Sequence, residues 1–170
     1  LDAECACSGG DDSLMQRLVI PRETSWCCSQ DWGYNSPGVI LFWAHVGDHH
    51  WHIAREIKFQ HETAETVAGR WKAMMRELGL KRVAYVAADP SMWAKTGHGR
   101  GESIAETLQR HGLPMLKGDN DRKNGWQRCY ELLRLAPDGR TWLPLDTRCV
   151  YGLPSLAART SPSFRPASSA

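Results

Sequence analysis

The stretch Arg82-Val-Ala-Tyr-Val-Ala-Ala-Asp89 decides the fold of this 170-residue chain. Its residues 83–88 are apolar almost throughout, which is typical of a central strand of a parallel sheet, buried on both faces. The stretch follows residues 62–78, where apolar side chains recur at helical spacing and glycine ends the pattern. A buried strand reached through a helix indicates an α/β fold.

Antiparallel strands are predicted upstream of that helix. Residues 26–32 form an expected buried strand that ends in a turn, and residues 38–46 are an apolar run rich in β-forming side chains. Gly47-Asp48 is a hairpin signal, so the run is expected to pair with a strand over residues 49–59.

The strand over residues 49–59 alternates between apolar and polar side chains. The apolar set predicted to share one face is Trp51, Ile53, Ile57 and Phe59. The polar set predicted on the other face is His50, His52, Glu56 and Lys58. The alternation predicts an antiparallel pair with one wet face.

The elements predicted after Asp89 are a glycine-rich segment over 96–101, a short helix from Ser103 to Gly112 that starts with a capping box, a strand over 113–116, a helix over 124–135 and a strand over 140–150. This order predicts an α/β fold with a mixed sheet, in which an antiparallel three-strand meander is followed by parallel strands with flanking helices. Three regions are expected: a linker or edge segment over 1–24, the main domain over 25–152, and a low-complexity, disordered tail over 153–170.

The composition limits the classes of function that are possible but does not identify one. The net charge is +2, and between Arg55 and Arg140 basic residues outnumber acidic ones by 16 to 11, which allows a polyanionic partner without requiring one. The six cysteines lack zinc-finger spacing, so reduced thiols are expected. Since no apolar run approaches the length of a membrane span, no membrane association is expected.

Asp31 and Asp89 each end a predicted strand. If these strands are neighbours, both carboxylates lie at one edge of the sheet, and two acids held that close repel each other unless a cation lies between them. The pattern therefore predicts a divalent metal site. Taken singly, each aspartate fits an ordinary turn or strand end equally well.

The chain resembles a known family in the order of several motifs. They are Asp31-Trp-Gly33, the Pro37-Gly-Val39 that opens the apolar strand, Ala88-Asp-Pro-Ser91, the glycine-rich segment, and Lys117-Gly-Asp-Asn-Asp-Arg-Lys-Asn-Gly-Trp126. This set, over about residues 10–152, resembles the C-terminal nuclease domain of the large terminase subunit of tailed bacteriophages, which has a ribonuclease-H-like fold.

The resemblance implies a nuclease that cuts concatemeric double-stranded phage DNA during genome packaging in the cytoplasm of the bacterial host. It implies a two-metal site for Mg²⁺ or Mn²⁺, with Asp31 and Asp89 as catalytic residues and metal ligands. Its partners would be the terminase ATPase domain, the small terminase subunit and the portal. The basic side chains expected to contact DNA phosphates are Lys95, Arg100, Arg122, Lys123 and Arg128.

The sequence departs from the family pattern in one respect that concerns the chemistry. The family carries a third acid on a C-terminal helix, and no matching motif follows Val150. Asp146 is the last acid, but it lies in a predicted strand and does not match that position. A truncated domain lacking its third acid is therefore expected. The sequence also contains no phosphate-binding loop of the kind found in ATPases. Two alternatives stay open: an inactive DNA-binding remnant, and another ribonuclease-H-like nuclease of resolvase or transposase type.

Overall fold

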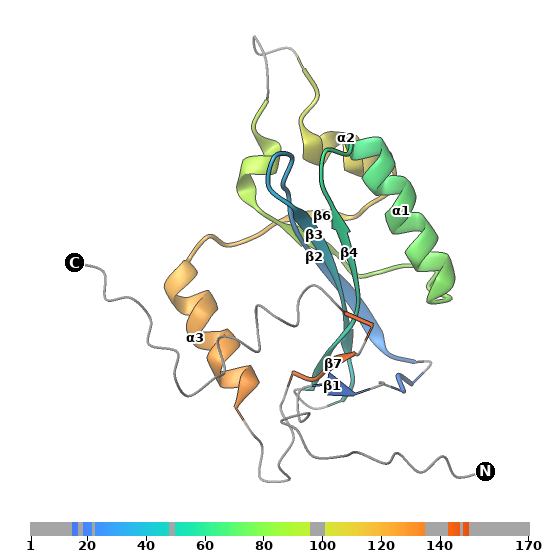
Figure 1. The fold of residues 1–170 in the computed structure, drawn as a ribbon, viewed down its shortest axis with the longest axis vertical. Helices are drawn as coiled ribbons and strands as arrows, with labels where there is room; N and C mark the ends of the chain where they lie inside the picture. The colour runs from blue at the N-terminus through green and yellow to red at the C-terminus, as the bar shows by residue number, and fades with distance from the viewer. Residues whose placement is uncertain are drawn as a thin grey trace.

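A single mixed sheet forms the centre of the molecule (Figure 1). The computed structural model describes residues 15–16, 19–21, 23–47, 50–95, 101–134, 143–146 and 148–149. The strands are β1 (Met15–Gln16), β2 (Ser25–Asp31), β3 (Gly38–His45), β4 (Trp51–Phe59), β5 (Val86–Ala88), β6 (Met115–Lys117) and β7 (Leu145–Asp146). Their order is β1-β7-β4-β3-β2-β5-β6. Antiparallel β2, β3 and β4 are extended by parallel β5 and β6, which confirms the predicted meander followed by parallel strands.

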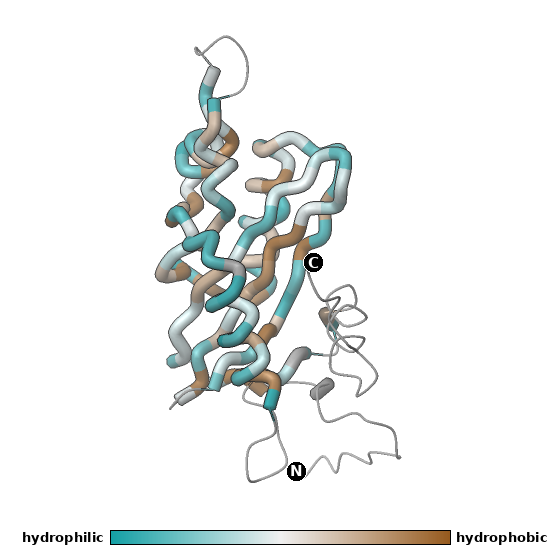
Figure 2. Tube along the Cα trace, turned by 90° about the vertical axis from the view of Figure 1, so that its left-hand side faces the viewer, coloured by the Kyte–Doolittle hydropathy of each residue, from teal (hydrophilic) through white to brown (hydrophobic). Residues whose placement is uncertain are grey.

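Helices α1 (Ala64–Glu77) and α2 (Ile104–Arg110) cover one face of the sheet (Figure 1). Thr63 caps the start of α1, and Ser103 with Glu106 forms the predicted capping box of α2. The core between these helices and the sheet includes Phe42 and Leu108, which are fully buried. Figure 2 shows hydrophobic stretches along the strands and hydrophilic residues at the turns beyond their upper ends.

Helix α3 (Arg122–Leu133) lies on the side of the sheet opposite to α1 (Figure 1). It begins two residues before the predicted 124 because the Asp121 side chain accepts hydrogen bonds from the Lys123 and Asn124 amides. The strand expected over 140–150 is seen only as the two residues of β7 within the described part of this region. In the described residues no helix is long and apolar enough to cross a bilayer.

The predicted alternation of the strand over 49–59 is wrong in its N-terminal half. Phe42 pairs with Arg55 whereas Trp43 pairs with Ile53, so Ala54 is an extra residue at a β-bulge. Since a shift by one residue moves side chains to the other face, Ile53 faces away from the face that carries Ile57. Ile57 and Phe59 lie in the core under α1, and Ile53 packs with Trp43 and Trp51 on the opposite face.

A tight turn, residues 32–37, connects β2 to β3 directly after Asp31, and neither Gly33 in the turn nor Gly38 directly after it has room for a larger side chain. A Cβ atom at Gly33 would lie 2.2 Å from the backbone oxygen of Ser36, and one at Gly38 would lie 2.4 Å from the Phe59 ring. His61 also donates its amide to the Tyr34 carbonyl at 3.1 Å. The turn is therefore held in one conformation beside the end of β4.

We expect Gly33→Ala to lower the free energy of unfolding by about 2 kcal/mol or more, since the added methyl group meets backbone that must move. Gly69→Ala is the matched control. Gly69 lies in the interior of α1, and its Cβ would meet nothing within 4 Å. That replacement should stabilise the protein by about 0.5–1 kcal/mol. Urea unfolding measures both changes, and equal effects of the two replacements would contradict this account of the turn.

Candidate metal site

Asp31 and Asp89 lie side by side at one edge of the sheet. Strands β2 and β5 are parallel neighbours, and Gln30 pairs with Ala88, so the next position on each strand is an aspartate. Adjacent strands are about 4.8 Å apart. Asp31 is exposed and Asp89 is half-buried, so the pair is open to solvent.

The two aspartates share the face of the sheet opposite to α1 and α2, which we call the open face, and Leu132 of α3 lines part of it. Alternate residues of β2 and β5 line one groove of about 220 Å³ on this face, namely Cys27, Ser29, Tyr85 and Ala87. Asp31 and Asp89 continue the same alternation by one step. The sequence predicted only that each aspartate ends a strand, whereas the pairing of the two strands and the common face of the two side chains follow from the structure.

The segment after β5 holds Asp89 in place. Its Oδ1 atom accepts a hydrogen bond of 2.7 Å from the Ser91 amide and thereby caps the 3₁₀ helix η2 (Pro90–Trp93). Pro90 suits this position because the first helical residue needs no amide donor. An ionised carboxylate has about four acceptor sites, so capping leaves it able to bind a cation. Asp89 therefore caps η2 and is at the same time a candidate metal ligand.

Two further acids, which the sequence analysis did not place at the site, follow the next parallel strand. Lys117 pairs with Ala88, so Asp119 lies just beyond the level of Asp89. Asp119 accepts from the Asp121 amide at 3.0 Å, and Asp121 caps α3. The signal was the Gly118-Asp119 pair after a short apolar strand. Among the described residues, however, no three histidines, cysteines or acids lie close enough together to hold a metal ion.

Asp146 is not a further ligand at this edge. It is completely buried on β7, where both of its carboxylate oxygens accept hydrogen bonds of 2.6 Å from Arg148. Arg55 lies 3.8 Å from it on the neighbouring strand β4. Hydrogen bonding to Asp146 raises the pKa of Arg148. The ion pairs make Asp146 part of the scaffold at the far edge of the sheet.

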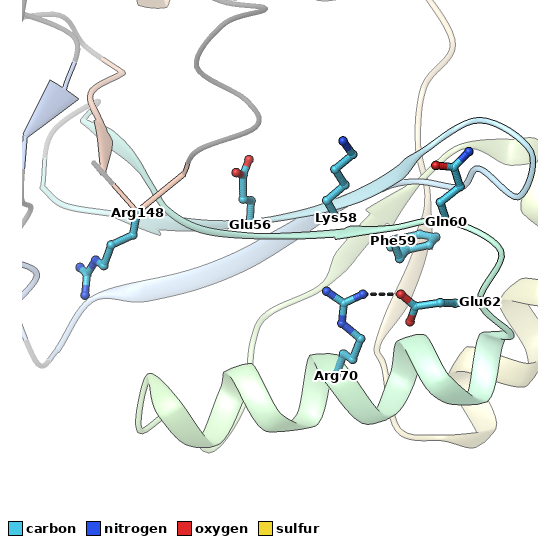
Figure 3. A pocket seen from close by; sticks show the side chains of 7 residues that line it. All are labelled: Glu56, Lys58, Phe59, Gln60, Glu62, Arg70 and Arg148. Carbon is cyan, nitrogen blue, oxygen red and sulfur yellow. Dashed lines mark hydrogen bonds and ion pairs between the residues drawn. The ribbon is translucent and has the colours of Figure 1, made fainter.

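A row of side chains extends from the aspartates across the open face. Val39 pairs with Asp31 on one side and with Lys58 on the other, which places Lys58 two strands from Asp31. Figure 3 shows Glu56 and Lys58 of β4, and Gln60 directly after this strand, projecting away from α1, while Arg70 and Glu62 pair on the α1 side. The open face therefore carries a cation within two strand spacings, about 10 Å, of the aspartates.

The cysteines near the site are not suited to bind a metal. Burial raises the pKa of Cys28 to about 12 and also raises the pKa of Cys27. Only the thiolate is a strong ligand, and both thiols are protonated at neutral pH. Oxygen ligands from the two aspartates favour a hard cation such as Mg²⁺ or Mn²⁺.

The basic residues predicted to contact DNA are spread over the structure. Lys95 is exposed just after η2, and Lys123 is exposed near the start of α3. Arg128 is exposed on α3 and pairs with Glu131 at 3.1 Å. Arg122 is the first residue of α3, and Arg100 lies outside the described residues.

The sequence and the structure were compared with those of known proteins. No protein-family model matches the sequence, and no curated protein is significantly similar to it. Solved structures match it over most of its length. The nuclease domain of the P22 large terminase superposes on 82% of the chain with a TM-score of 0.62 at 20% identity. This chain has the fold of a large-terminase nuclease domain.

Two further terminase structures, both from thermophilic bacteriophages, agree. One is a large terminase that matches 83% of the chain with a TM-score of 0.64 at 16% identity. The other is the large terminase nuclease of phage G20c with bound zinc, which matches 86% with a TM-score of 0.54 at 18% identity. The chain spans 32% of the first protein, 74% of the G20c nuclease and 71% of the P22 domain. The central strands β4-β3-β2-β5-β6 have the expected ribonuclease-H-like order.

Proposed function

We propose that this domain is a divalent-metal-dependent endonuclease that cleaves double-stranded phage DNA during genome packaging. One observation carries the proposal: Asp31 and Asp89 occupy adjacent register positions on two parallel strands, at an open face of a terminase-nuclease fold. In this proposal Asp31 and Asp89 would correspond to the first two acids of the terminase nucleases.

The residues present suit a hard cation. Mg²⁺ is commonly held by one or two carboxylates and completes its coordination with water and substrate phosphate, so Asp31 and Asp89 would suffice for one weakly bound ion. When bound, such ions polarise the phosphate and generate the attacking hydroxide. Asp31 and Asp89 would position the ions, and Lys58 would attract the DNA backbone toward them. A full two-metal site would need one more carboxylate, for which Asp119 is nearest in register.

The direct test is the conversion of supercoiled plasmid to nicked and linear forms by the 170-residue chain. We expect cleavage with Mn²⁺ and Mg²⁺, and none after chelation with EDTA. A folded chain that binds DNA but does not cut it under any divalent metal would instead support the inactive remnant. The position of Asp119 after β6 does not by itself distinguish an active nuclease from an inactive remnant, so this measurement decides between the two functions.

DNA binding is proposed to involve α3, whose start follows the third parallel strand. We expect Lys123→Ala to weaken the binding of any DNA sequence alike and to reduce the slope of log affinity against log salt by about 1, because one phosphate contact is lost. Arg128→Ala should have a smaller effect, since Glu131 partly neutralises that charge. Fluorescence anisotropy across a salt series measures both. An unchanged slope for Lys123→Ala would mean that α3 does not contact DNA through this residue and would contradict the proposed role of the helix.

The domain boundaries and partners belong to the same proposal. Residues 25–152 would be the nuclease domain, residues 1–24 a linker or edge segment, and residues 153–170 a tail. Because the chain spans only 32% of one large terminase with the same fold, a covalently linked ATPase domain, a small terminase subunit and a portal are proposed as its partners. The cytoplasm of the bacterial host is the proposed location. A resolvase-type or transposase-type nuclease is the alternative, and cleavage confined to branched DNA would favour it.

A further inference from the structure

A groove lies beside the C-terminal half of α1, away from the candidate metal site. Helix α1 has 14 residues and α2 has only 7, and among the described residues no helix lies beside the C-terminal half of α1 (Figure 1). The groove holds about 460 Å³ and ends at Gly112 and Pro114, which follow α2. The unequal lengths of the two helices therefore leave a recess on the covered face of the sheet.

The floor of the groove is apolar. Trp71 and Met75 of α1 and Val83 of the segment before β5 line it, and each remains 6% exposed. Leu80, from the loop that follows α1, adds a half-buried wall. This floor suits one or two apolar side chains of a ligand.

The rim of the groove is basic. Four cations line it, namely Lys72, Arg76, Lys81 and Arg82. Within the described part of the chain no acid lines the groove, and none of these four cations takes part in an ion pair. In contrast, Arg55, Arg70, Arg110, Arg128 and Arg148 all pair with acids. Four unpaired charges around an apolar floor are complementary to a ligand that combines carboxylates with apolar side chains.

The position of the groove separates it from DNA bound at the aspartates. Trp71, Met75 and Val83 belong to the core on the α1 face, whereas Asp31 and Asp89 share the open face. The groove also lies at the opposite end of the strands, where the Ala84 amide bonds to the Trp26 carbonyl. The length of helix α1, about 21 Å, gives the scale of the separation between the two ends of the sheet. A duplex lying on the open face therefore does not cover this groove.

We propose that the groove docks an acidic segment of a partner protein, with one or two apolar side chains on the Trp71 floor and carboxylates against the four cations. A protein ligand is favoured over a nucleic acid because the floor is apolar and phosphate backbones present no apolar side chains. The inference is independent of the proposed cleavage activity, since it uses none of the residues of the metal site.

The test is a titration of the ¹⁵N-labelled chain, followed by amide chemical shifts, with a short glutamate-rich peptide that carries two leucines. We expect amide shifts confined to residues 71–83 and 112–113. The double variant Lys72→Glu/Arg82→Glu should bind at least about tenfold more weakly. The double variant Lys117→Glu/Arg134→Glu, an equal charge change at two exposed positions outside the groove, should bind like the parent chain.

Three outcomes would overturn the proposal. They are the absence of shifts at millimolar peptide, equal binding of a peptide with serines in place of both leucines, and equal or stronger shifts of the same amides by a short metal-free DNA duplex. The last would assign the groove to a nucleic acid. Because Lys72 and Arg82 are exposed, the double variant should keep the dispersed spectrum of the folded chain, which separates lost binding from lost structure.

Discussion

Asp31→Asn is expected to abolish metal-dependent cleavage of supercoiled plasmid, with a fall in rate of about 100-fold or more. The amide is close in size to the carboxylate but carries no charge, so the site loses one of its two anionic ligands while the turn after β2 keeps its shape. Since a divalent ion supplies several kcal/mol of transition-state stabilisation, and each 1.36 kcal/mol is roughly a tenfold rate, losing a ligand should remove most of the activity.

Asp89→Asn is expected to have the same effect on cleavage, with an added loss of stability of up to about 1 kcal/mol because Asp89 also caps η2. Glu23→Gln is the matched control, since it removes an exposed carboxylate that precedes the start of β2, whereas Asp31 is at the other end of this strand. Calorimetric titration with Mn²⁺ should show weaker binding to both aspartate variants and unchanged binding to the control. Full cleavage by a folded Asp31→Asn chain would exclude Asp31 as a ligand and would refute the proposed site.

The second large effect is expected at Asp146, which is completely buried between two arginines. We expect Asp146→Asn to lower the free energy of unfolding by about 3–5 kcal/mol, because removing one partner of a buried ion pair leaves an uncompensated charge. Arg55 is only 9% exposed, and its remaining ion pair would be the 3.3 Å contact to the exposed Glu77. The urea midpoint of unfolding measures this loss.

Glu131→Gln provides the comparison for Asp146→Asn. It breaks the exposed pair with Arg128 on α3, and surface pairs of this kind contribute about 0.5 kcal/mol or less. A loss below about 1 kcal/mol for Asp146→Asn would mean that water or neighbouring groups replace the carboxylate, and that β7 is not held to β4 by these charges. Cleavage activity per folded molecule should not change, since Asp146 lies away from the candidate metal site.

Features with a local cause could be predicted from the sequence. The capping box at Ser103 and the helix that ends before Gly79 depend on residues within one or two turns of each other. The apolar strand before Asp89 was also recognised, but its pairing as β5 is limited to Val86–Ala88. The preceding residues bond irregularly, since the Cys28 amide donates to the Tyr85 carbonyl and the Ala84 amide to the Trp26 carbonyl.

Features that depend on pairing between distant segments could not be predicted. The bulge at Ala54 changes the face on which Trp51 and Ile53 lie, and nothing in their regular alternation indicates it. Asp146 looked like an ordinary strand residue, and one of its ion-pair partners is Arg55, which is far away in the sequence.

The sequence by itself determined that Asp31 ends one strand and that Asp89 directly follows another, because strand formation and the turns after the strands follow from short-range side-chain preferences. Only the tertiary structure decided that these strands are parallel neighbours in a register that brings the two aspartates level on one open face. The physical reason is that register depends on burying one set of side chains against α1 and α2, and this burial involves the whole sheet at once.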